Sequence, residues 1–159
     1  MKLILFQPQI PQNTGNIVRT CSVTGASLIL VHPLGFSVTD RWLKRAGLDY
    51  WGGVNVSFLD DLASFEQYLE QTENQFYFYS SKAKRKYSDI KYTENDILVF
   101  GSETSGLPES FNEKWPERFA TIPMVEGARC LNLATSAGIV LYEAWRQQGF
   151  VAGSTVIGN

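Results

Sequence analysis

Residues 1–31 read MKLILFQPQIPQNTGNIVRTCSVTGASLILV and contain the pattern that decides the fold class. Two short apolar runs, at residues 2–6 and 27–31, predict buried strands. Between them, residues 7–13 hold two prolines and predict a loop, after which Thr14 can cap a helix. A helix between two buried strands is typical of α/β domains with parallel strands.

The same alternation continues along the chain. Further strands are expected at residues 54–58, 75–80, 97–100 and 118–122. Further helices are expected after Asp40, after Asp60 or Asp61, from Pro108, and at residues 132–148. The sequence therefore predicts one α/β domain at residues 1–150, with a mainly parallel sheet flanked by helices, and a flexible tail at residues 151–159.

The 159 residues carry a net charge of −2, which by itself argues against a nucleic-acid partner. The charge is unevenly spread, however. Residues 51–81 hold five acidic and no basic residues, whereas residues 82–91 hold five basic residues and one acidic residue. Because the basic residues are segregated, an anionic ligand such as RNA stays compatible with this sequence.

Several classes of protein are disfavoured by what the sequence lacks. Its only histidine, His32, lies at a strand end and is a weak basis for a catalytic triad. The sequence contains three Cys or His residues in total: His32, Cys21 and Cys130. A structural zinc site needs about four such ligands, so no metal is expected. No glycine-rich dinucleotide fingerprint follows the first strand. No apolar run could span a membrane and no secretory signal is evident, so we expect a cytoplasmic protein without a membrane partner.

Three loops that follow strand ends are rich in Gly, Pro, Asn and Ser. Ligands of open parallel sheets bind at the carboxyl ends of the strands, so the site should lie there. The first loop opens a helix at residues 11–19, PQNTGNIVR, whose amides and dipole suit an anion such as phosphate. Asn16 and Arg19 share one face of that helix, although a capped helix with a surface arginine explains this piece equally well.

The other two loops are residues 100–108, FGSETSGLP, and residues 122–133, IPMVEGARCLNL. Taken together in this order, the three pieces resemble the signature motifs of the SPOUT superfamily, in its SpoU branch of RNA 2′-O-ribose methyltransferases. The resemblance covers residues 6–149. It is strongest to the small members that methylate the wobble cytidine or uridine of tRNA, through residues 45–50, RAGLDY, and 142–147, YEAWRQ.

This resemblance implies a trefoil knot, a homodimer whose active sites draw on both chains, and S-adenosylmethionine as the cofactor. The cofactor would be held largely by backbone groups, and the matching positions are Tyr79, Gly101, Ile122, Cys130 and Leu131. Cys130 stands where we expect serine in close relatives. A backbone amide serves equally well from cysteine, and a small buried hydrophobe is the simpler interpretation of its side chain.

The resemblance also implies methylation of the ribose 2′-hydroxyl of a wobble cytidine or carboxymethylaminomethyluridine, with leucine tRNAs as the expected substrates. Arg19 matches the arginine to which the family assigns the activating role. Two roles stay open for Arg19: it acts as the base or, since a guanidinium rarely gives up its proton, it holds a phosphate and stabilises alkoxide charge. Asn16 would orient the arginine or the ribose. Glu103 either organises the second loop or is a solvated carboxylate in a turn.

Contacts to the tRNA anticodon stem-loop are expected from Arg129, Lys44 and Arg45. The basic run at residues 82–86, KAKRK, is a further candidate, although such runs are most often solvated loops. Two alternatives stay open: a SpoU-type methylase of another RNA, and a knotted module that binds RNA without catalysis.

Overall fold

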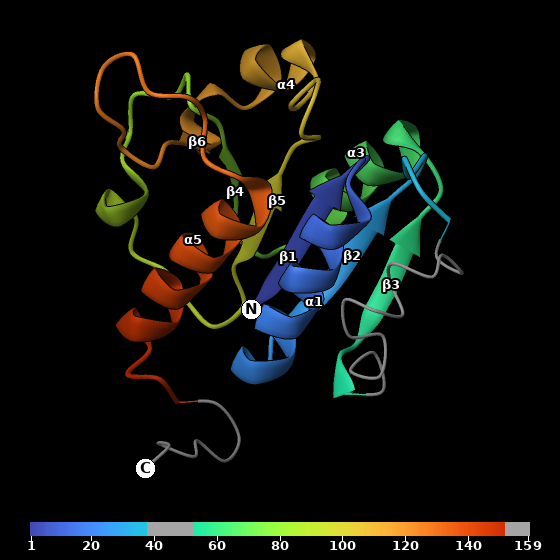
Figure 1. The fold of residues 1–159 in the computed structure, drawn as a ribbon, viewed down its shortest axis with the longest axis horizontal. Helices are drawn as coiled ribbons and strands as arrows, with labels where there is room; N and C mark the ends of the chain where they lie inside the picture. The colour runs from blue at the N-terminus through green and yellow to red at the C-terminus, as the bar shows by residue number, and fades with distance from the viewer. Residues whose placement is uncertain (38–52, 152–159) are drawn as a thin grey trace.

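A computed structural model describes residues 1–37 and 53–151. Within this part of the chain, six strands form one sheet in the order β3-β2-β1-β5-β4-β6, and each adjacent pair is parallel (Figure 1). The strands are β1 (Lys2–Phe6), β2 (Ser27–Val31), β3 (Val56–Leu59), β4 (Phe76–Tyr79), β5 (Ile97–Phe100) and β6 (Phe119–Ala120). The predicted α/β domain with a parallel sheet flanked by helices is confirmed.

Helices cover both faces of the sheet. On one face, α1 (Pro11–Thr24) and α5 (Leu133–Gln147) lie side by side (Figure 1). On the other face, α3 (Leu62–Gln71) and the short α4 (Glu109–Lys114) bury Phe65 and Phe111 against the strands. Side chains alternate between the two cores, as the period of a strand requires. Two short 3-10 helices, η2 (Tyr87–Asp89) and η3 (Pro116–Arg118), complete the described elements.

The start of α1 differs from the prediction. The helix begins at Pro11, with Ile10 as its N-cap and no side-chain cap, and Thr14 is buried inside it. Proline is well suited to the first helical position, because it lacks the N–H that would otherwise stay unpaired there and its φ is already helical. The predicted loop at residues 7–13 is therefore shorter than expected.

Other helix ends follow the sequence signals. Asp61 caps α3 in a reciprocal capping box with Ser64, and these hydrogen bonds lower the pKa of Asp61. Asn132 caps α5 through its side chain. The last strand is shorter than predicted, because beyond Ala120 the chain continues only as an isolated bridge between Thr121 and Lys86.

The strand order creates a crevice at the centre of the sheet. After β1 the chain leaves for the face of α1, whereas after the neighbouring β5 it leaves for the face of α4. Such a switch point opens a crevice at the carboxyl ends of the two strands, where ligands of these sheets bind. After β6, at the sheet edge, the chain returns so that α5 packs against α1 (Figure 1). The trefoil knot stays a prediction of the resemblance.

Two further predictions fall on residues that are not described. The helix expected after Asp40 lies among residues 38–52, and most of the expected tail lies among residues 152–159. The division into a domain and a tail therefore stays a prediction. Among the helices of the described ranges, none combines the length and the apolar character needed to cross a membrane.

Candidate active site

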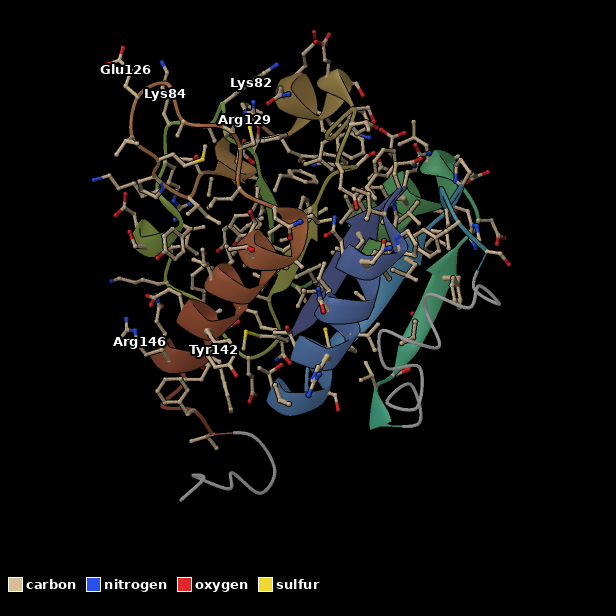
Figure 2. The ribbon with its side chains drawn as sticks, viewed as in Figure 1. Lys82, Lys84, Glu126, Arg129, Tyr142 and Arg146 are labelled. Carbon is tan, nitrogen blue, oxygen red and sulfur yellow. The ribbon has the colours of Figure 1, made fainter. Side chains whose placement is uncertain are left out.

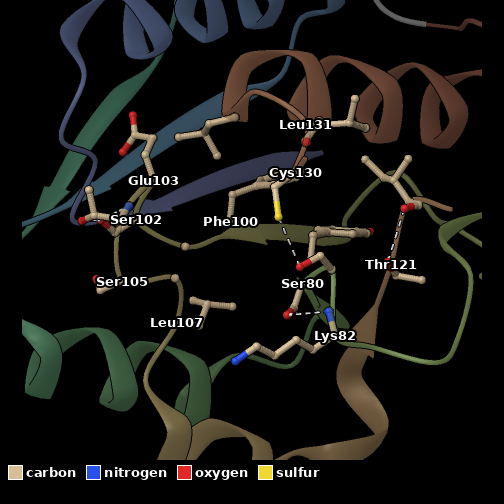
Figure 3. A pocket seen from close by; sticks show the side chains of 18 of the residues that line it. Ser80, Lys82, Phe100, Ser102, Glu103, Ser105, Leu107, Thr121, Cys130 and Leu131 are labelled. Atoms are coloured by element: carbon tan, nitrogen blue, oxygen red, sulfur yellow. Dashed lines mark hydrogen bonds between the residues drawn. The ribbon is translucent and has the colours of Figure 1, made fainter. Parts of the chain in front are cut away.

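A cavity of about 890 Å³ lies at the carboxyl ends of β4, β5 and β6 (Figure 3). Its walls come from residues 79–82, from the loop at residues 101–107 and from the loop that leads to α5, and Ile10 and Asn13 close it near α1. The volume is in the range of pockets that bind small molecules. The cavity lies at the carboxyl ends of the strands, as the sequence predicts, but it extends from β5 towards β4 and β6 and reaches the segment after β1 only at Ile10 and Asn13.

The five residues predicted to contact the cofactor are brought together by the fold. Each of them lines this cavity: Tyr79, Gly101, Ile122, Cys130 and Leu131. They come from two strand ends and one loop, separated by up to 52 positions in the sequence. The grouping agrees with a common binding site, and their contact with a cofactor stays a prediction.

The side chain of Tyr79 is occupied within the core. Its ring stacks on Phe100, and its hydroxyl lies 2.9 Å from the hydroxyl of Tyr92, which in turn donates to the Tyr87 carbonyl. Because the single hydroxyl proton of Tyr92 is given to the Tyr87 carbonyl, the Tyr79 hydroxyl donates to Tyr92, and burial raises the pKa of Tyr79. The hydroxyl of Tyr79 is thus engaged within the core, so a ligand contact through this hydroxyl is not expected.

The loop after β5 is closed tightly on itself. Ser102 N donates to the Gly106 carbonyl over 3.1 Å, and Gly106 N donates back to the Ser102 carbonyl over 2.9 Å. A Cβ on Gly101 would lie 2.4 Å from the carbonyl carbon of Gly106, and Gly106 itself has φ of +69°. Only glycine accepts this approach and this backbone conformation without strain. The cavity wall at this point therefore consists of backbone.

Glu103 reaches from this loop to the start of α1. Its carboxylate accepts hydrogen bonds from Gln9 N at 2.8 Å, Ile10 N at 3.2 Å and Asn13 Nδ2 at 2.9 Å. A carboxylate of the chain itself thus lies just before the start of α1, and the binding of an anion such as phosphate by the first-turn amides stays a prediction. Glu103 organises the first loop together with the second.

Asn13 and Asn132 extend the connection to the third loop. Asn13, only 5% exposed, accepts from Asn132 Nδ2 at 2.8 Å, and Asn132 Oδ1 accepts from Ala134 N at 2.8 Å and Thr135 N at 3.3 Å. One chain of hydrogen bonds thus joins all three loops. The pairing of these two asparagines was not predicted from the sequence, because 119 positions separate them and their residue type is the only signal.

Replacing Glu103 with alanine is expected to lower the free energy of unfolding by about 2 kcal/mol, because two backbone amides and the Asn13 amide lose their acceptor. Urea denaturation measures this, with the slope of free energy against urea unchanged. Glu73→Ala, at an exposed carboxylate of the same charge, is the control and should leave stability unchanged. Equal stabilities of the two variants would contradict a structural role for Glu103.

Asn16 and Arg19 lie outside the cavity. Both are exposed on α1, one turn apart on the same face, and neither is among the residues that line the cavity. The shared face is as predicted, but the fold of one chain does not bring these two side chains together with the predicted cofactor residues.

The residues predicted to bind RNA divide into two groups. Arg129 is exposed on the loop that leads to α5, at the same end of the molecule as Lys82 and Lys84 (Figure 2). Lys44 and Arg45 lie outside the described residues.

The two cysteines differ in their surroundings. Cys21 is buried in the core, where burial raises its pKa to about 12. Cys130 is exposed and its Sγ lies 3.6 Å from Ser81 Oγ at the cavity, so interpreting it as a small buried hydrophobe is wrong. His32 packs its ring near Phe58 and is absent from the cavity wall. Within the described residues, no group of three His, Cys, Asp or Glu side chains could hold a metal ion.

Comparisons with known proteins agree with this architecture. The model of the SpoU rRNA methylase family matches residues 1–142. A tRNA (cytidine(34)-2′-O)-methyltransferase of Methylovorus glucosotrophus is 44% identical over 149 residues, which cover 93% of this chain and 96% of the relative.

Two solved structures are similar throughout the described fold. One comes from work on the 2-OH methylation of C/U34 on tRNA and is 39% identical, with a TM-score of 0.86 and coverage of 93% and 95% of the two chains. The other is an AdoMet-bound rRNA methyltransferase from Sinorhizobium meliloti. It is 26% identical, with a TM-score of 0.81, and the match covers 91% of this chain and 55% of that one. On its sequence, its fold and the placement of its three loops, the chain belongs to the SpoU methylase family.

Proposed function

We propose that this chain is a methyltransferase that transfers the methyl group of S-adenosylmethionine to the ribose 2′-hydroxyl of nucleotide 34, the wobble nucleotide, in the anticodon loop of tRNA. The observation that carries this proposal is the cavity at which all three loops meet, in a chain 44% identical to a relative named for this reaction. The cytidine or carboxymethylaminomethyluridine of leucine tRNAs is the proposed target, and the cytoplasm is the proposed location.

The cavity suits S-adenosylmethionine. Its walls combine apolar side chains, such as Leu107 and Leu131, with serine and asparagine side chains and with the backbone of the glycine loop. This mixture fits a ligand with a flat purine, a ribose and a charged amino-acid end. When bound, the cofactor supplies an electrophilic methyl group. The chain would hold it through Tyr79, Gly101, Ile122, Cys130 and Leu131.

Arg19 is the proposed catalytic residue. Its guanidinium would hold the phosphate next to the target ribose and stabilise negative charge on the 2′-oxygen as the proton leaves. Asn16, one turn earlier on the same face, would orient the ribose. Arg129 would contact a phosphate or a nucleobase, together with Lys44 and Arg45.

A homodimer would bring Arg19 of one copy to the cavity of the other. This is supported by the exposed face of α1, where Val23, 60% exposed, follows Arg19 by one turn. On the adjacent α5, Tyr142 is 44% exposed. Large apolar side chains on neighbouring helices favour a covered surface. A second copy that covers Val23 would also bury the part of α1 that carries Arg19.

The test is mass spectrometry of nucleosides from tRNA of a strain that lacks the gene, with and without this chain restored. We expect 2′-O-methylation of nucleotide 34 to appear only when the chain is present. A methylated nucleotide elsewhere that depends on the chain would favour another RNA substrate. Absence of S-adenosylmethionine binding by calorimetry would instead favour the non-catalytic RNA-binding module.

A further inference from the structure

The basic run at residues 82–86 is held in place by the sheet, unlike a solvated loop. Ser80 N donates to the Ala120 carbonyl at 2.9 Å, and Thr121 N donates to the Arg85 carbonyl at 2.8 Å. Tyr87 N donates to the Thr121 carbonyl at 2.9 Å, and Lys86 pairs with Thr121 in a parallel bridge. The end of the run is thus bridged to Thr121, and its start is a turn in which Ala83 N donates to the Ser80 carbonyl at 3.2 Å. Its backbone is ordered before any ligand arrives, which lowers the entropic cost of binding.

The ammonium groups of this run have no carboxylate partner within the described residues. Ion pairs in the described ranges use Lys114, Arg118 and Arg146, and Arg85 lies over the Tyr77 ring. Three exposed lysines are left in the run, and we define them as the basic ridge. Its members are Lys82, Lys84 and Lys86. Cations that are clustered on an ordered backbone are well placed to bind a polyanion.

The basic ridge borders the cavity. Lys82 lines it, and Figure 3 shows its extended side chain beside the loop of residues 102–107. The contact between Ser81 Oγ and Cys130 Sγ, at 3.6 Å, joins the start of the ridge to the residue that follows Arg129. Figure 2 shows Lys82, Lys84 and Arg129 at one end of the molecule, with the carboxylate of Glu126 near them. Lys82 and Cys130, the residue after Arg129, therefore line the cavity from two different loops, and Lys84 lies at the same end of the molecule.

We propose that the basic ridge binds phosphate groups of the RNA substrate and, with Arg129, holds the RNA backbone over the mouth of the cavity. The proposal rests on the proposed function for the identity of the RNA. The ridge would act in binding and positioning, because a phosphate contact fixes the register of a nucleic acid without reading its bases. An ordered ridge next to the reacting ribose is the arrangement that such positioning needs.

The test measures the affinity of the full chain for an anticodon stem-loop RNA at several salt concentrations. In Lys84→Ala/Lys86→Ala, we expect roughly tenfold weaker RNA binding. The slope of log affinity against log salt should be shallower by about 0.7 for each phosphate that the variant no longer neutralises. The affinity for S-adenosylmethionine should not change. Lys82→Ala should likewise weaken RNA binding only. A weaker affinity of this variant for S-adenosylmethionine would remove Lys82 from the ridge.

Lys91→Ala is the matched control. Lys91 is an exposed lysine of the same basic block, but its neighbours Ile90 and Tyr92 are bound by Gln147, at the end of α5 opposite the cavity. Ser136 of α5 lines the cavity, and the helical rise from Ser136 to Gln147 places that end about 16 Å along the axis from the cavity wall. We expect Lys91→Ala to bind RNA with the same affinity and the same slope of log affinity against log salt as the unchanged chain. Equal losses of RNA affinity in Lys91→Ala and in the double variant would overturn the proposed role of the ridge. They would show that RNA is held by diffuse electrostatic attraction alone.

The same samples separate this proposal from the proposed function. Suppose that the unchanged chain methylates nucleotide 34, while the double variant binds RNA with unchanged affinity and unchanged salt slope. The RNA-binding role of the ridge is then wrong, and the proposed methyltransferase function holds. If RNA binding depends on the ridge lysines but nucleotide 34 is never methylated, the RNA-binding role of the ridge holds and the proposed reaction is wrong.

Discussion

Replacing Arg19 with alanine is expected to reduce the rate of methyl transfer about a thousandfold while S-adenosylmethionine binds with unchanged affinity. Removing one preorganised donor to a developing oxyanion costs a factor of this size. Cofactor affinity should persist because Arg19 does not line the cavity. Single-turnover transfer to an anticodon stem-loop RNA measures the rate, and calorimetry measures the affinity.

Two further variants make the result specific to Arg19. Arg19→Lys keeps the charge but loses the planar fork of donors, so we expect a rate between those of the alanine variant and the unchanged chain. Arg146→Ala removes an exposed arginine that is paired with Glu143, and the rate should stay as it is. If Arg19→Ala transfers methyl groups at the full rate, the catalytic role of Arg19 is wrong.

Replacing Gly101 with alanine should weaken S-adenosylmethionine binding by more than tenfold and destabilise the fold by about 1–3 kcal/mol. The added Cβ would lie 2.4 Å from the Gly106 carbonyl carbon and 2.6 Å from Leu107 N, so the loop that forms one wall of the cavity must open. Calorimetry and urea denaturation measure the two effects. In Gly53→Ala, the nearest contact of the new Cβ is Ser22 Oγ at 3.9 Å, and neither quantity should change. Normal cofactor affinity in Gly101→Ala would show that this loop does not shape the site.

The two inactive variants together test the homodimer. If Arg19 of one copy serves the cavity of the other, a mixed dimer of Arg19→Ala and Gly101→Ala chains contains one site that lacks both changes. Mixing should therefore restore part of the activity, whereas sites built within single chains would stay inactive. No recovery after subunit exchange would contradict the composite site.

The fold class was predictable because its signals are local. Short apolar runs such as residues 27–31 and 97–100 bury strands, and the residues that separate them are typical of turns and helix ends. The capping box of Asp61 and the side-chain cap of Asn132 also depend on residues three or fewer positions away. The start of α1 was misplaced because Pro11 opens the helix without a side-chain cap, while the distant Glu103 binds the amides of Gln9 and Ile10 just before it.

The sequence by itself determined which segments form strands and which loops follow them, because hydrophobic period and turn chemistry act between neighbours in the chain. It also determined the family, since three loop motifs recur in one order. Only the tertiary structure decided which groups meet. It places Glu103 at the start of α1, joins Asn13 to Asn132, and pairs Lys86 of the basic ridge with Thr121. These pairs are 35 to 119 positions apart, and partners so distant are set by how the strands are ordered in the sheet, which no local pattern specifies.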